Sequence, residues 1–155
     1  MTQELEKLAS FSGKRKSITA EDVEELTGRS LAASAFDITR AIDGNKIDDA
    51  MKICSDLIRT GRKEHEIVGL LCWHLRRVLK AKMMQARGLG TGQIALAMNV
   101  GRRYQDEFFR QVSGLKTARI RSRIMALLDA DLDIKRTRLN PRIVLEIAVI
   151  RLCLC

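Results

Sequence analysis

Apolar side chains recur every three or four residues along most of this chain, and sustained alternation of apolar and polar positions is missing. The first spacing puts apolar groups on one face of an α-helix, whereas a half-buried strand alternates at every second residue. Glycines fall between the periodic segments, and the sequence holds a single proline. The pattern therefore predicts an all-α protein.

The breaks between periodic segments predict where the helices begin and end. Gly28 and Gly61 are helix-stop residues, and Gly88 opens a flexible turn. Two short helices come first, over residues 2–11 and 19–28, and they are too few to hold a core. The remaining predicted helices cover residues 36–42, 46–60, 64–87, 93–98, 102–112, 116–135 and 141 to the end.

The last two helices carry the most informative pattern of the chain. Asp131 and Lys135 lie one turn apart in the order that supports a helix, and Asn140 with Pro141 predicts a new helix start. The final helix is apolar nearly all round, which a small monomer can bury only in its core or against another chain. Candidate subunit-interface residues on this helix are Leu145, Val149 and Leu152.

The long helix predicted over residues 64–87 has two different faces. Its core spacing is carried by Ile67, Leu70, Leu71, His74, Leu75 and Val78. A second face holds Trp73, Arg76, Arg77 and Lys80. Because Trp and Arg are enriched among residues that dominate binding energy, these four are further subunit-interface candidates. A half-buried core role is the alternative for Trp73.

Charge is unevenly distributed along the chain. The net charge is +9, with 9 Lys/Arg against 11 Asp/Glu in residues 1–60 and 19 against 8 in residues 61–155. A basic part of this kind favours an acidic partner, either nucleic acid or an acidic protein face. Arg119, Arg121 and Arg123 alternate and so spread around their helix, which is typical of a solvated face.

Residues 93–112 resemble a helix-turn-helix. Arg102, Arg103 and Tyr104 would stand at the start of its second helix, where this motif contacts bases and phosphates. The same geometry is also a common way to pack two helices, and the second helix carries Asp106 and Glu107. A DNA-binding protein is therefore the alternative function.

The sequence shows no pattern of residues that is typical of nucleotide binding, metal binding or acid/base catalysis. No phosphate-binding glycine loop is present, and His65 and His74 are nine residues apart, which is not the one-turn spacing of helical metal ligands. The carboxylates of residues 129, 131 and 133 alternate around a helix, so no pair is held together for acid/base work. We expect no catalytic residue, no cofactor and no metal, and therefore no enzyme.

Cysteine usage and hydropathy indicate a cytoplasmic protein. The four cysteines show neither a disulfide framework nor zinc spacing, so reduced thiols are expected. No apolar run approaches a membrane span, and the first residues lack the regions of a signal peptide.

The order of these features is similar to the C-terminal half of the bacterial DNA polymerase III delta subunit family, a component of the clamp loader. The resemblance spans about residues 18–152, and each of its motifs alone is moderately specific. The segments that carry it are residues 18–28, 36–45, 67–77 and 127–135 with the helix that follows.

The resemblance implies a helical bundle of the clamp-loader collar type at residues 31–155, serving oligomerisation. Residues 1–30 would be the tail of a small helical, lid-like subdomain. The expected partners are other clamp-loader subunits in a hetero-oligomer, with weak or indirect DNA contact and no membrane. In the family the sliding-clamp contact lies in a preceding nucleotide-binding-like module, which this sequence lacks. The subunit would be non-catalytic, although its parent holoenzyme is a DNA-directed DNA polymerase.

Overall fold

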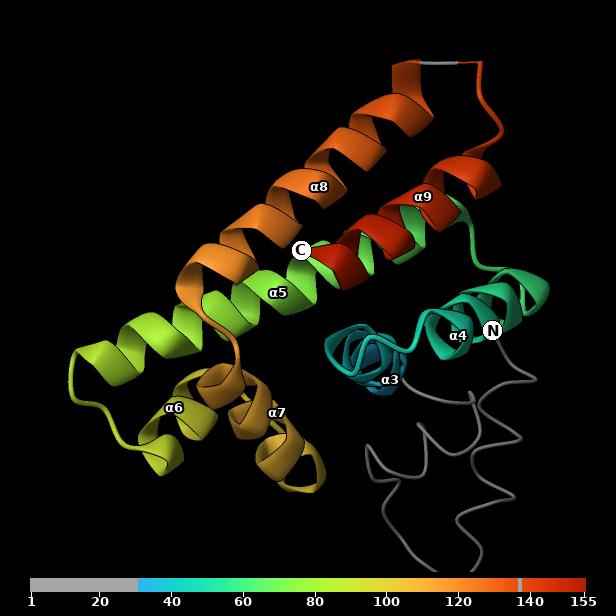
Figure 1. Ribbon diagram of the computed structural model, residues 1–155. Helices are drawn as coiled ribbons and strands as arrows, with labels where there is room; N and C mark the ends of the chain where they lie inside the picture. The colour runs from blue at the N-terminus through green and yellow to red at the C-terminus, as the bar shows by residue number, and fades with distance from the viewer. Residues whose placement is uncertain (1–30, 137) are drawn as a thin grey trace, which may run out of the picture. The chain divides into compact units, whose positions relative to one another are not determined.

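Helices joined by short loops make up the part of the chain that the computed structural model describes, residues 31–136 and 138–155 (Figure 1). They are α3 (Leu31–Asp43), α4 (Ile47–Arg59), α5 (Glu64–Ala86), α6 (Thr91–Ala97), α7 (Arg102–Gly114), α8 (Thr117–Arg136) and α9 (Pro141–Leu154). The all-α prediction is confirmed. The helices predicted at 2–11 and 19–28 lie outside the described residues, so the proposed division at residue 30 stays a prediction.

Most helix ends fall within two residues of the predicted positions. Asn140 accepts a hydrogen bond from the Arg142 amide at 2.9 Å, as its predicted capping role requires. Gly61 has a φ of 93°, the left-handed conformation that ends a helix at little cost for glycine. Helix α3 begins five residues earlier than predicted, because alanines around residue 33 favour helix and no break precedes Phe36.

The long helix α5 lies at the centre of the arrangement. Helix α8 runs back along α5, and α9 returns along α8, with α4 packed against α9 (Figure 1). Helices α6 and α7 pack against the C-terminal half of α5 (Figure 1). Helix α3 packs against α5 and α7 through Phe36. The centre of its ring lies 4.6 Å from the ring centre of His74 on α5 and 5.5 Å from that of Tyr104 on α7. The buried side chains of all seven helices form one core cluster.

Two cations of α5 hold the ends of neighbouring helices. The Arg77 guanidinium donates to the Met98 carbonyl at 2.9 Å, just past α6. The Lys82 ammonium donates to the Val112 carbonyl at 2.7 Å, in the last turn of α7. Helix C-termini expose unpaired carbonyl groups and carry partial negative charge, so these contacts satisfy both. They fix α6 and α7 against α5.

Candidate subunit interface

Helix α9 has apolar side chains on two opposite faces. One face is buried and consists of Val144, Leu145, Ala148, Val149, Leu152 and Cys153. The other, the α9 stripe, consists of Ile143, Ile147, Ile150 and Leu154, whose exposed fractions run from 38% to 74%. Spacings of four, three and four residues keep the α9 stripe on one side of the helix. It is an apolar surface about three turns long.

Burial corrects the choice of interface residues on this helix. Leu145, Val149 and Leu152 are at most 1% exposed and belong to the chain's own core, so a partner could not reach them in the folded chain. The α9 stripe holds the accessible residues instead. The sequence shows both sets as equally apolar, and only the packing of α4, α5 and α8 against α9 tells them apart.

The face predicted on α5 is exposed except for one residue. Trp73 is 44% exposed, and Arg76 and Lys80 are exposed as well. Arg77 is partly buried, with its guanidinium 4.7 Å from the centre of the Trp73 ring and 5.6 Å from that of Phe108. Arg77 therefore positions Trp73 and caps α6, while the other three remain available to a partner.

The three residues that the alternative, DNA-binding hypothesis names at the start of α7 differ in their exposure to solvent. Arg102 and Arg103 are exposed, whereas the Tyr104 ring is partly buried and stacks against Phe36 with an angle of 9° between the rings. Between α6 and α7, Asn99 adopts a φ of 48°, a conformation that asparagine tolerates in tight turns. Tyr104 thus serves packing, as does the Phe108 ring one turn later, which is fully buried.

A buried polar chain runs from α5 through α7 to α3. Gln111 donates to the Thr39 hydroxyl at 2.9 Å, and Thr39 donates to the Ala35 carbonyl at 2.8 Å. The Gln111 carbonyl oxygen is therefore left to accept from Nε2 of His74, at 2.7 Å. Nδ1 of His74 is buried and has no hydrogen-bond partner within residues 31–136 and 138–155. Burial, with a smaller contribution from the charge of Arg77, lowers the pKa of His74 to about 4.

The sequence patterns did not predict a buried ion pair between Arg123 and Asp43. Arg123 is 1% exposed, donates to the Leu152 carbonyl at 3.0 Å and pairs with Asp43. The prediction that Arg123 lies on a solvated face is wrong. Its contacts tie α8 to α9 and to the end of α3, so its role is to hold helices together.

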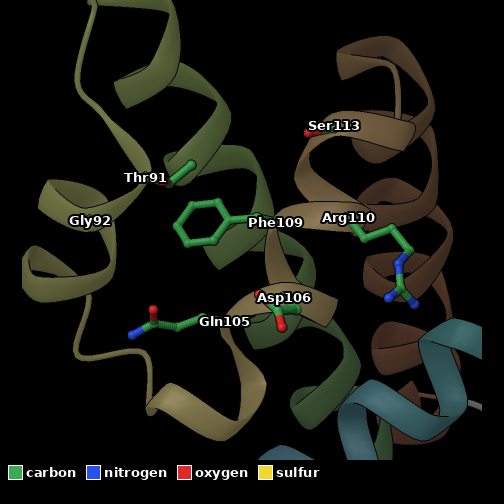
Figure 2. Close-up of a pocket in the computed structure, with 7 residues that line it drawn as sticks. All are labelled: Thr91, Gly92, Gln105, Asp106, Phe109, Arg110 and Ser113. Carbon is green, nitrogen blue, oxygen red and sulfur yellow. The ribbon is translucent and has the colours of Figure 1, made fainter.

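An open cleft of about 440 Å³ separates parts of α6 and α7 (Figure 2). The Phe109 ring projects from α7 toward the start of α6, whereas Arg110 points to the other side of α7. The cleft is lined by Thr91, Gly92, Gln105, Asp106, Phe109, Arg110 and Ser113. Asp106 is its single carboxylate, so the cleft offers no carboxylate pair for acid/base chemistry.

The described residues offer little for metal or thiol chemistry. Within residues 31–136 and 138–155, no three His, Cys, Asp or Glu side chains converge as metal ligands would. The cysteines are free thiols, and burial raises the pKa of Cys54 to about 12, which keeps this thiol protonated and unreactive. None of the helices in the same residues has the length and apolarity that crossing a bilayer requires.

The arrangement of α3–α9 is that of the C-terminal helical part of a DNA clamp-loader subunit. A solved structure, the Bacillus subtilis DNA clamp loader delta protein, matches with a TM-score of 0.75 and 27% identity, over 99% of this chain and 45% of that one. The chain belongs to the family described as DNA polymerase III delta subunit, C-terminal domain, whose model matches residues 32–152. The resemblance found in the sequence is thereby confirmed.

A curated relative gives the same result at the level of the sequence. The DNA polymerase III subunit delta of Bacillus subtilis (strain 168) is 27% identical over 161 aligned residues. The alignment covers 97% of this chain but 43% of the relative, so the chain spans less than half the length of the proteins it matches. These matches do not favour the helix-turn-helix alternative at residues 93–112.

Proposed function

We propose that this chain is the C-terminal part of a clamp-loader delta subunit, which assembles with other clamp-loader subunits in the cytoplasm and performs no chemistry itself. Support comes from the family membership and from the names of its relatives, a polymerase III delta subunit and a clamp loader delta protein. In this proposal residues 31–155 form the oligomerisation domain, and DNA contact is weak or indirect.

The α9 stripe is the observation that carries the proposal. Four aliphatic side chains in consecutive turns stand in water although the opposite face of the same helix already fills the core. Their spacing of four, three and four residues is that of the seam between packed helices. Covering them with a neighbouring helix would remove apolar surface from water, which is the main driving force of stable association.

The first test places charge in the α9 stripe. The double variant Ile147→Glu/Ile150→Glu should enter a complex with the other clamp-loader subunits at least about tenfold more weakly, because a partner would have to desolvate two carboxylates. Binding is measured by sedimentation velocity on the reconstituted mixture. The single variant Leu96→Glu is the matched control, because Leu96 is 86% exposed on α6, outside the stripe.

Two results would contradict the proposal. The first is that the unaltered chain stays out of the complex at micromolar concentration. The second is that the Leu96→Glu control weakens assembly as much as the stripe variant does. Circular dichroism of both variants checks that they remain folded, which their exposed positions predict.

A further inference from the structure

Helix α5 presents a second unpartnered face, on the side away from its own core contacts. This α5 outer face consists of Trp73, Arg76, Lys80 and Met83, with Arg87 directly after the last helical residue, at spacings of three, four, three and four residues. All five side chains are exposed, with Trp73 at 44% and Met83 at 52%. The spacing is that of a helix seam, in which a second helix can lie along the first. Here the two apolar positions flank two cations and a third cation follows.

The sequence around the α5 outer face contains basic residues and no acidic residues to balance them. The 39 residues from 67 to 105 contain seven Lys or Arg and no Asp or Glu. Arg77 and Lys82 are used to hold the carbonyls of Met98 and Val112. Arg76, Lys80 and Arg87 form no ion pair with any of the residues that the structure describes. The positive charge of the α5 outer face is therefore available to a partner.

Trp73 is held in one orientation before any partner arrives. The Arg77 guanidinium lies 4.7 Å from the centre of its ring and is itself fixed by the Met98 carbonyl. A side chain that is already ordered loses little entropy on binding, so it contributes more of its contact energy to affinity. Trp and Arg are enriched among the residues that dominate binding energy at protein interfaces, and this face carries Trp73 next to arginines.

We propose that the α5 outer face binds an acidic amphipathic helix of a partner protein. Met83 lies ten residues after Trp73, about 15 Å along the helix axis. The complementary segment has apolar side chains about three turns apart, to pack on Trp73 and Met83, and carboxylates between them to pair with Arg76 and Lys80. The inference does not depend on the assembly through the α9 stripe, because it concerns another helix and a partner defined by its chemistry alone.

A protein segment fits this face better than nucleic acid does. Phosphates would pair with the three cations, and a base could stack on Trp73. Met83 would then remain an exposed apolar side chain inside the contact, with no counterpart on the nucleic acid. An amphipathic helix satisfies the apolar and the charged positions together, and its geometry matches the seam spacing.

The test uses a designed peptide as the probe and the full 155-residue chain as the receptor. The helical peptide carries two leucines about eleven residues apart with two glutamates between them on the same face. Its isomer, of identical composition, has the leucines on the opposite face. Trp73 is the only tryptophan of the chain, so its emission reports binding directly. An oligothymidylate and a duplex of similar charge form the nucleic-acid arm.

At physiological salt the peptide should bind at least about tenfold more tightly than its isomer and than either nucleic acid. Met83→Ser and the pair Lys80→Gln/Arg87→Gln should each weaken the peptide by about tenfold, measured by anisotropy of a labelled peptide. The matched control, Lys52→Gln/Arg62→Gln, removes two exposed cations elsewhere and should leave binding unchanged.

Three outcomes would overturn this inference. They are equal binding of peptide and isomer, tighter binding of either nucleic acid, and no peptide binding at about 100 µM. The stripe variant Ile147→Glu/Ile150→Glu should bind the peptide normally. Failure of the assembly proposal and failure of this inference are therefore separate results.

Discussion

His74 shows how a single buried ring makes the fold sensitive to acid. Its Nε2 donates to Gln111, and among the described residues its buried Nδ1 has no acceptor for the second N–H that protonation would create. Protonation would place a charge among the rings of Phe36 and Phe108 and near Arg77. The neutral ring is thus the form that the folded chain requires.

Stability should therefore fall as the pH drops through the range in which His74 titrates. The folded chain holds the pKa of His74 at about 4, below its ordinary value of 6.5, so the unfolded chain takes up this proton first. The contribution is complete above pH 6.5 and is lost progressively down to about pH 4. Between pH 7 and pH 5 it amounts to about 2 kcal/mol of unfolding free energy.

Urea unfolding of the unaltered chain and of His74→Gln at both pH values measures this effect. The glutamine variant has no proton to gain, so the stability difference between the two proteins should shrink by about 2 kcal/mol at pH 5. A difference that does not change with pH would contradict the assignment of this titration to His74.

The pair of Arg123 and Asp43 gives a second prediction at the scale of residues. Asp43→Ala leaves a guanidinium that is 1% exposed without its counter-ion, which should cost about 3 kcal/mol of unfolding free energy. The double variant Asp43→Asn/Arg123→Met removes the buried charge as well and should recover most of the loss. A double variant as unstable as the single one would contradict this account.

Arg123 also marks a limit of what the sequence can show about single residues. Its neighbours Arg119 and Arg121 have the same type and the same alternating spacing, yet only Arg123 is buried. The difference arises because Asp43, eighty residues earlier, and the Leu152 carbonyl meet its guanidinium. Such a pairing depends on how helices pack and has no local signal.

At the scale of elements, the ends of helices were predictable because local chemistry determines them. Asn140→Ala should destabilise the chain by about 1 kcal/mol, since it removes the side-chain oxygen that accepts from the Arg142 amide. Asn140→Asp keeps that oxygen and is the matched control, expected to stay within a few tenths of the unaltered stability. Thermal unfolding of the three proteins compares them, and equal losses in both variants would exclude the cap as the cause.

Helix α9 shows which property of an element could not be predicted. Apolar residues lie on nearly all sides of it, and its charged residues Arg142, Glu146 and Arg151 stand to either side of the α9 stripe without forming one polar face, so they indicate the outward face only weakly. The sequence predicts that this helix lies in the core or against another chain. In the structure one face lies in the core and the other is exposed, where another chain could cover it. Leu145, Val149 and Leu152, named as interface candidates, lie in the core because α4, α5 and α8 pack against that face of α9.

For the whole molecule, the excess of positive charge predicts how the chain behaves toward DNA. Binding should be weak, blind to sequence, and reduced by roughly tenfold to a hundredfold between 50 and 200 mM salt, because only a few phosphates are contacted. Arg102→Ala/Arg103→Ala should weaken it equally for all sequences. Fluorescence anisotropy with two unrelated duplexes measures both effects. Site-selective binding that persists at physiological salt would restore the DNA-binding alternative.

Family and fold class were predictable from the sequence because they rest on the order of helices and caps along the whole chain. The candidate interface was predictable in part. The α5 face carrying Trp73 stood out because its polar and apolar sides differ, whereas the α9 stripe had no such contrast. Tyr104 lost its proposed role because its stacking partner, Phe36, comes from a helix far away in the sequence.

The double engagement of Arg77 links events on the surface to the interior. One guanidinium both steadies Trp73 and closes the end of α6, so a ligand that drew it aside would loosen Met98 and the turn beyond it. Amide hydrogens of α6 would then exchange faster with deuterium although the ligand itself does not contact that helix. A ligand bound to the outside of α5 would thus alter the mobility of residues some twenty positions further along the polypeptide.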